Sequence, residues 1–251
     1  MLMKKVISYS LWGDNPQYTH GAIHNANLIT STFPGWIMRV YYDNTVPTEV
    51  INTLKEAPNV ELFLINKTQH LWEGLYWRFY VHDDPTVERY IVRDLDDRLS
   101  RNDKACVDEW VNSNIPFHLI RTVLSHNTEM MGGLWGVVRS KLDFNMVDEI
   151  TKYNNNLPPN CKGPDQVFLK DKVWPLIKGK CLVHGLDFNY NSGIIKDFIY
   201  GENKRENYQG ILLPAAAGCV FGHDIKTWEE GWEKDNRVNF NVKEWYNSIR
   251  K

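Results

Sequence analysis

Two aspartates stand directly behind an apolar run in the stretch YIVRDLDDRLS at residues 90–100. The apolar residues 90–92 predict the end of a buried strand, and Asp94 and Asp96 form a D-x-D pattern just after it. Two hard oxygen ligands two residues apart can point toward one cation, and Mn²⁺ and Mg²⁺ prefer carboxylate, water and phosphate oxygens. The pattern therefore indicates a divalent-cation site that can bridge to a diphosphate.

A D-x-D pattern is common by chance, so its surroundings decide how it is interpreted. The alternative is a solvated turn in which the aspartates form salt bridges with Arg93 and Arg98. The apolar strand ahead of the pattern favours the metal site, as does the absence of an obvious helix-capping role for three aspartates. The role of the third, Asp97, is left open.

The first half of the chain predicts a scaffold for these side chains. Apolar, extended runs alternate with helical segments of about ten residues, which indicates βαβ units and a mostly parallel sheet. In such sheets ligands bind beyond the carboxyl ends of the strands, where we expect the loop at residues 10–18 and the D-x-D stretch to converge. The predicted strands are 5–9, 36–42, 60–65, 89–92 and 117–121, and the predicted helices are 21–33, 47–57, 71–82 and 105–111.

The pattern loosens from Gly132 onward. The stretch GGLWGVVRS is glycine-rich and then extended, residues 145–153 and 165–177 predict helices, and residues 180–184 predict a late strand. Neither an internal repeat nor a domain linker interrupts the chain. We therefore expect one α/β domain over residues 1–251.

Bulk composition excludes several classes of protein. The net charge of -2 and the pI of about 6.4 give no basic excess for binding nucleic acid. No run approaches the roughly 18 apolar residues that span a bilayer. The four cysteines are widely spaced, which disfavours a zinc site or a disulfide framework. We expect a soluble, cytoplasmic protein. A viral protein made in the cytoplasm of its host would also fit this expectation.

Taken in order, several motifs resemble those of metal-dependent glycosyltransferases of the GT-A fold, a Rossmann-like nucleotide-diphospho-sugar transferase fold. The closest likeness is to a group of small, often viral or bacterial, D-x-D glycosyltransferase-like proteins. One departure is that Asp-Leu-Asp-Asp stands where this group has an Asp-Ser-Asp-Ser type of stretch, which keeps both liganding positions. The resemblance covers about residues 5–185 and is carried by SLWGDNPQY at 10–18, WRF at 77–79, IVRDLDDRLS at 91–100, DEWVNS at 108–113, His126 with GGLWG at 132–136, and GPDQVFL at 163–169.

The resemblance implies that a sugar nucleotide lies across the carboxyl end of the sheet. Its base would lie beside Ser8, Leu11 and Trp12, although core packing is the alternative for Trp12. Asp94 would hold the Mn²⁺ or Mg²⁺ cofactor together with its partner in the D-x-D pattern. Arg78 would pair with the diphosphate, because a guanidinium binds phosphate oxygens in a bidentate way. Its alternative role is an ordinary pair with an aspartate.

Further site residues are expected in the second half of the chain. Gly132 and Gly133 would let the backbone approach the sugar, or would simply form a tight turn. His184 is the candidate third metal ligand, with His223 as its rival, although a histidine at a strand end is often structural. Asp165 would face the acceptor and accept a proton from its hydroxyl, or else cap the helix that it begins.

The sequence therefore predicts transfer of a sugar from a nucleotide-diphosphate donor, UDP-linked, to a hydroxyl of a glycan or other acceptor. Residues 1–125 would form the nucleotide-sugar half and residues 126–251 the acceptor half. A sugar-phosphate nucleotidyltransferase is the nearest alternative, but it would carry a glycine-rich basic first loop, and SLWGDNPQY has one glycine and no Lys or Arg. A glycan-binding module that stacks sugars on tryptophan, or a purely structural protein, are the non-enzymatic alternatives. The donor sugar, the acceptor, the stereochemistry and the oligomeric state are not predicted.

Overall fold

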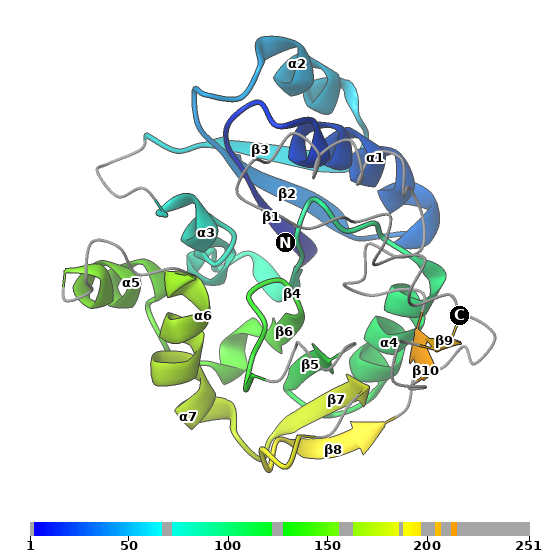
Figure 1. The fold of residues 1–251 in the computed structure, drawn as a ribbon, viewed down its shortest axis with the longest axis vertical. Coiled ribbons are helices and arrows are strands. Elements are labelled where there is room, and N and C mark those ends of the chain that lie inside the picture. The colour runs from blue at the N-terminus through cyan, green and yellow to red at the C-terminus, as the bar shows by residue number, and fades with distance from the viewer. Residues whose placement is uncertain are drawn as a thin grey trace.

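The computed structural model describes residues 3–66, 72–121, 128–155, 163–185, 188–196, 204–206 and 212–214. Its centre is an eight-stranded sheet in the order β3-β2-β1-β4-β6-β5-β7-β8 (Figure 1). All of these strands are parallel except β6, which runs antiparallel to both of its neighbours. The strands are β1 (Lys4–Leu11), β2 (Ile37–Tyr42), β3 (Val60–Leu64), β4 (Val87–Val92), β5 (Phe117–Arg121), β6 (Trp135–Val138), β7 (Cys181–Gly185) and β8 (Gly193–Lys196).

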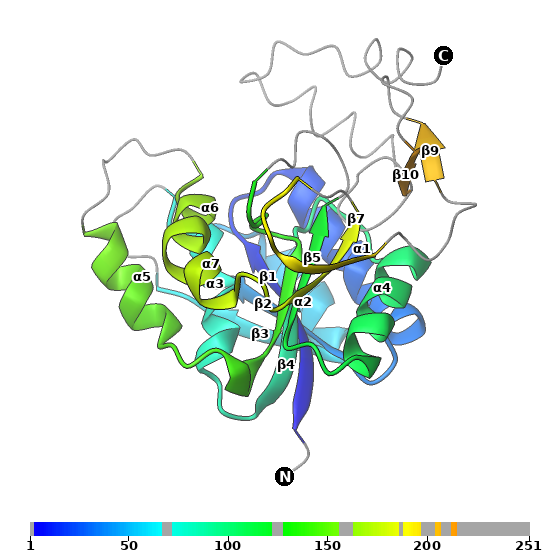
Figure 2. The same cartoon turned by 90° about the horizontal axis from the view of Figure 1, so that it is seen from below.

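Helices cover both faces of the sheet, which gives three layers (Figures 1 and 2). One face carries α1 (Pro16–Thr32), α2 (Thr48–Glu56) and α4 (Arg101–Asn112). The other carries α3 (Gly74–Trp77), α5 (Met146–Asn154), α6 (Pro164–Phe168) and α7 (Trp174–Ile177). A short antiparallel pair, β9 (Lys204–Glu206) and β10 (Leu212–Pro214), stands apart from the main sheet.

Two hydrophobic clusters fill the spaces between these layers. Successive side chains of a strand point to opposite faces, so β4 supplies Tyr90 and Val92 to one cluster and Ile91 to the other. Because helices cover both faces, the buried segments of the central strands, such as residues 90–92, carry apolar side chains on both faces of the sheet. The predicted mixed α/β architecture with a mostly parallel sheet is confirmed.

Element boundaries differ from the predictions most clearly at three helices. Helix α4 begins at Arg101, four residues before the predicted start at residue 105. Helix α1 begins at Pro16, five residues before the predicted start, because the Asn15 side chain accepts a hydrogen bond from the Gln17 backbone N–H at 2.9 Å and Pro16 suits the first turn. The helix predicted over residues 71–82 is wrong. Its described part consists of two separate short turns, α3 and a 3₁₀ turn at Tyr80–Asp83. The aromatic side chains of both turns pack into the core.

The second half follows its predictions more closely. Residues 164–177 are helical throughout, with a π-helical turn at Leu169–Val173 between α6 and α7. The late strand is β7, shifted by one residue from the prediction. A 3₁₀ turn at Arg139–Lys141 follows β6. Among the described helices, none has both the length and the apolar character that crossing a bilayer requires.

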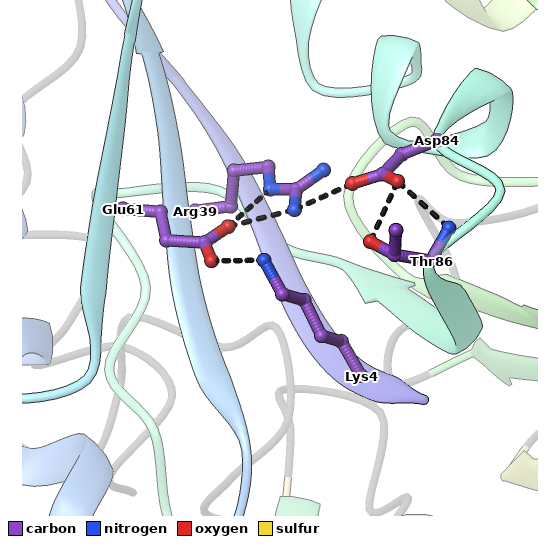
Figure 3. A network of polar contacts seen from close by, with 5 residues as sticks. All are labelled: Lys4, Arg39, Glu61, Asp84 and Thr86. Atoms are coloured by element: carbon purple, nitrogen blue, oxygen red, sulfur yellow. Dashed lines mark hydrogen bonds and ion pairs between the residues drawn. The ribbon is translucent and has the colours of Figure 1, made fainter. Parts of the chain in front are cut away.

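A polar network links β1, β2 and β3 near their amino-terminal ends to the segment just before β4 (Figure 3). Arg39, whose side chain is 1% exposed, donates to Glu61 at 2.7 Å and pairs with Asp84 at 2.8 Å. Lys4 also reaches Glu61, and Thr86 donates its backbone N–H to Asp84 at 2.8 Å. Burial alone would raise the pKa of Glu61, but the hydrogen bonds from Lys4 and Arg39 outweigh it and hold that pKa below its usual value. The network stabilises the end of the sheet opposite to the D-x-D stretch.

Candidate functional site

The acidic turn after β4 is anchored to the helix that follows it. Arg93 is 2% exposed and donates to both carboxylate oxygens of Asp103 in α4, at 3.0 and 2.7 Å, and to the Val92 carbonyl at 2.7 Å. Ser100 caps the same helix by accepting from the Asp103 backbone N–H at 3.1 Å. Arg93 is therefore committed to the scaffold, contrary to the alternative in which it pairs with the D-x-D carboxylates.

The three aspartates of the turn divide into two kinds. Asp94 and Asp96 are partly exposed, whereas Asp97 is buried. Asp97 accepts from the Arg98 backbone N–H at 3.0 Å, and its own N–H donates to the Asp94 carbonyl at 3.3 Å. Asp97 therefore stabilises the turn itself, which assigns the role that the sequence left open.

Asp94 and Asp96 form an electrostatically strained pair. Burial and, next to it, the neighbouring charge of Asp94 together raise the pKa of Asp96 to about 7. A cation beside the two carboxylates would relieve both effects, so the residues present fit a divalent metal. No group of three or more metal-binding side chains occurs in the part of the chain that the structure describes.

Arg78 connects Asp94 to a second carboxylate. Its side chain is 7% exposed, pairs with Asp94 through Nη1, and donates from Nη2 to Asp165 at 2.9 Å. Two serines of β1 fix its backbone, because Ser8 donates to the Arg78 carbonyl at 2.6 Å and Ser10 accepts from the Arg78 N–H at 2.9 Å. The first strand therefore holds the guanidinium in place between two acids.

The glycine pair lies in the turn just before β6 and packs against this cluster. The register places Val92 opposite Trp135, so the start of the antiparallel β6 meets the end of β4. A Cβ on Gly133 would overlap the Asp94 carboxylate, and a Cβ on Gly132 would overlap Asp165 and lie 2.7 Å from an Arg78 nitrogen. Neither glycine has a left-handed φ, so glycine is required here for space and not for backbone conformation.

Asp165 lies in the first turn of α6 and is 3% exposed. The backbone turns into the helix at Gly163, with φ of 62°, and Pro164 occupies the first helical position. Burial raises the pKa of Asp165, although Arg78 opposes the shift. The helix start predicted at GPDQ is confirmed, and its aspartate points into the acidic cluster. A buried carboxylate of raised pKa is a better proton acceptor than an ordinary aspartate.

The residues predicted to line the nucleotide wall do not all reach the surface. Ser8 is 0% and Leu11 is 1% exposed, so direct contact of these side chains with a nucleotide is a wrong prediction. Ser8 supports Arg78 instead, and Leu11 packs in the core. Trp12 is half-buried, with its ring edge-to-face on Trp77 at 6.0 Å and over Gly74, where a Cβ would lie 2.5 Å from the indole.

His184 lies in a separate cluster. Its Nδ1 is 2.9 Å from His118 Nε2, its Nε2 is 3.0 Å from Glu109, and it is 0% exposed. Burial lowers the pKa of His184, and Glu109 opposes the shift. Because both ring nitrogens have protein partners, the prediction that His184 completes the metal site is wrong. His223 and His126 lie outside the described residues.

One acidic residue at the same edge was missed. Asp43 follows β2 and is 3% exposed; its Oδ1 accepts from the Thr45 backbone N–H at 3.0 Å, while its Oδ2 has no hydrogen-bond partner among the described residues. Thr45 in turn accepts from the Gly13 N–H at 2.7 Å, which joins the first two loops of this edge. An acidic residue directly after a predicted strand is the signal that singled out Asp94, and it applies equally to Asp43.

No family model matches the chain, and no curated protein matches it. Several of the solved structures to which the fold is similar are glycosyltransferases of the GT-A type. One is a glycosyltransferase involved in the glycosylation of the major capsid of PBCV-1, at 14% identity and TM-score 0.48, covering 72% of this chain and 81% of that one. The galactosyltransferase LgtC gives 10% identity and TM-score 0.47, covering 98% and 100%. The mannosyltransferase PcManGT of Pyrobaculum calidifontis, solved with GDP-Man and Mn²⁺, gives 11% and 0.47. That match covers 70% of this chain, which spans about half of PcManGT.

Proposed function

We propose that this protein is a metal-dependent glycosyltransferase that moves a sugar from a nucleotide diphosphate, UDP-linked, to a hydroxyl of a glycan or other acceptor. One observation supports this more than any other. Two partly exposed carboxylates of one turn, an arginine, a buried aspartate and a glycine pair, from four segments of the chain, meet at the carboxyl edge of the sheet. This combination suits a ligand that carries phosphate and sugar groups side by side.

Asp94 and Asp96 would hold Mn²⁺ or Mg²⁺. Such an ion, when bound, neutralises the charge that develops on a departing diphosphate. Arg78 would add a positive charge beside it. Its guanidinium pairs with two carboxylates in the structure, and exchanging the contact with the more exposed Asp94 for phosphate oxygens would let it bind and orient the diphosphate.

The sugar would lie near Gly132 and Gly133, where the missing side chains make room for the Asp94 and Asp165 carboxylates that would face it. In the transfer, the acceptor oxygen bonds to the anomeric carbon and the bond from that carbon to the diphosphate oxygen breaks. The acceptor proton passes to the Asp165 carboxylate, which burial makes the more basic. The nucleoside diphosphate leaves as the second product.

The nucleoside would lie near Trp12 and Asp43. The indole of Trp12 offers a partly exposed ring for stacking. The Asp43 oxygen without a described partner is an acceptor for an N–H or O–H of the nucleoside, because a buried carboxylate oxygen without a donor is costly.

A panel of UDP- and GDP-sugars tests the proposal, each added with Mn²⁺ and again with EDTA. We expect one donor to raise the melting temperature and to release free sugar and nucleoside diphosphate only when Mn²⁺ is present. Asp96→Ala should abolish both responses, whereas Asp143→Asn, which removes an exposed carboxyl far from the turn in sequence, should keep them. If no donor stabilises the protein, or if Asp96→Ala behaves as the wild type, the proposal is wrong.

The same panel separates the alternatives. Release of pyrophosphate from a nucleoside triphosphate and a sugar phosphate would identify a nucleotidyltransferase. Sugar binding that survives EDTA and needs no nucleotide would identify a glycan-binding module.

A further inference from the structure

One face of α1 lies directly on the acidic turn. Gln17, Gly21 and Asn25 are spaced by four residues, so they lie one above another on the same side of the helix. All three are buried, although two of them are polar and the third has no side chain. An apolar core would favour other residues at these positions, so their polarity requires a specific partner.

The first contact of this face reaches the metal-binding pair. The Gln17 amide nitrogen donates to Asp96 Oδ2 at 3.2 Å. Its own backbone is fixed by the Asn15 cap at the start of the helix. A neutral amide that binds one carboxylate oxygen leaves the other oxygen free and adds no positive charge that would compete with a cation.

The second contact is a close approach of two backbones. A Cβ on Gly21 would overlap the Leu95 carbonyl oxygen and would lie 2.9 Å from Arg98 Nη1. Arg98 Nη1 itself donates to the Leu95 carbonyl at 2.7 Å. Leu95 stands between the two candidate ligands, so the helix contacts the turn at its midpoint.

The third contact closes the turn. The Asn25 side chain donates to the Asp97 carbonyl at 2.8 Å and accepts from the Leu99 backbone N–H at 3.1 Å. Asn25 is 0% exposed, so both bonds are formed away from water. One amide therefore satisfies a backbone acceptor and a backbone donor on either side of Arg98, which fixes how the turn leaves the site.

We propose that Gln17, Gly21 and Asn25 form a positioning face that holds the acidic turn in its metal-binding conformation, with Gln17 orienting the Asp96 carboxylate toward a divalent cation. The inference rests on the proposed function, because it concerns the same cation. It gives three residues of α1 a role in metal affinity, although these residues would not touch the substrate themselves. Side chains that orient metal ligands in this way typically change metal affinity by about 10–100-fold when replaced.

Direct titration with Mn²⁺, alone and with UDP, tests this without relying on activity. Gln17→Met keeps the length of the side chain and removes the donor to Asp96. We expect Mn²⁺ binding to weaken about 10–100-fold in this variant. The melting temperature without metal should stay close to that of the wild type.

Gly21→Ala gives a second, independent test. Alanine has the higher intrinsic helix propensity, so a purely local effect would leave metal binding unchanged. The collision with the Leu95 carbonyl instead predicts a loss of Mn²⁺ affinity. Asn27→Ala, on the exposed side of the same helix, is the control and should bind Mn²⁺ as the wild type does.

The possible outcomes are distinct. Wild-type affinity in Gln17→Met, or an equal loss in Asn27→Ala, overturns the positioning role and leaves the proposed function in place. If the wild-type protein itself binds no Mn²⁺, with or without UDP, the proposed function is wrong and the inference falls with it.

Discussion

Replacing Arg78 with methionine should show how the site is held together. The guanidinium bridges two carboxylates of very different exposure: the Asp165 side chain is 4% exposed and the Asp94 side chain is 46% exposed. Methionine fills much of the same volume but removes both ion pairs. The contributions of the two ion pairs to the free energy of unfolding should therefore differ and can be measured separately.

The magnitude follows from these exposures. Breaking a buried ion pair by removing one partner costs about 3–5 kcal/mol, because the other charge stays buried and uncompensated. An exposed pair is worth only about 0–1 kcal/mol. We expect Arg78→Met to lower the free energy of unfolding by about 3–5 kcal/mol, almost all of it through Asp165. Asp94→Asn should lower it by less than about 1 kcal/mol.

Urea denaturation at pH 7 measures these differences, with the double variant Arg78→Met/Asp165→Asn as the matched comparison. The double variant should recover part of the loss, because it no longer buries an unpaired charge. In Arg78→Met alone, the buried Asp165 has a pKa raised above its value in the unfolded chain. The folded state then binds a proton more readily, so the deficit should shrink as the pH is lowered toward 5.

A clear result would refute this reasoning. If Arg78→Met costs no more than Asp94→Asn, or if the double variant is less stable than Arg78→Met, then Asp165 does not depend on Arg78 for its charge compensation. The bridging geometry would then not describe the protein in solution.

Three further predictions follow from other parts of the structure. Gly133→Ala should weaken Mn²⁺ binding at least about 10-fold in calorimetry, because the added Cβ displaces the neighbouring carboxylate, and unchanged affinity would contradict the close approach. Burial lowers the pKa of His118 well below its usual value, so the unfolded state binds a proton first and stability should fall by about 1.4 kcal/mol per pH unit below about pH 6.5. His118→Gln should flatten this slope in urea denaturation from pH 7 to 5, and exposed His20→Gln should not. Glu61→Gln should destabilise the protein at pH 7 but much less at pH 3.5, since the contribution of a carboxylate with a lowered pKa is lost as it is protonated; an equal loss at both pH values would exclude the ion-pair explanation.

The strands and the chemistry of the site were predictable because they are local in sequence. A short apolar run followed by polar residues marks the carboxyl end of a strand, and the run at residues 90–92 is how Asp94 and Asp96 were found. Asp165 was found because a Gly-Pro pair marks a helix start. The structure brings these residues together with Arg78, Gly132 and Gly133 as neighbours.

The residues that were mispredicted depend on partners far away in the chain. Ser8 and Leu11 belong to a strand buried on both faces, so nothing in their own stretch distinguishes inward from ligand-facing positions. His184 sits at a strand end, as predicted, but its direction is set by His118 on β5 and Glu109 on α4. Long-range pairing of this kind has no local signature.

The position of β6 in the sheet also has a consequence for how the chain can be divided. Because β6 is inserted between β4 and β5, a strand from the second half of the chain separates two strands from the first half. A fragment that ends near residue 125 would lack the strand that joins β4 to β5, together with Gly133, which faces Asp94, and Gly132, which faces Asp165. Strands of the two halves alternate in the sheet order β4-β6-β5, so exchanging one half between distant relatives would disrupt the sheet.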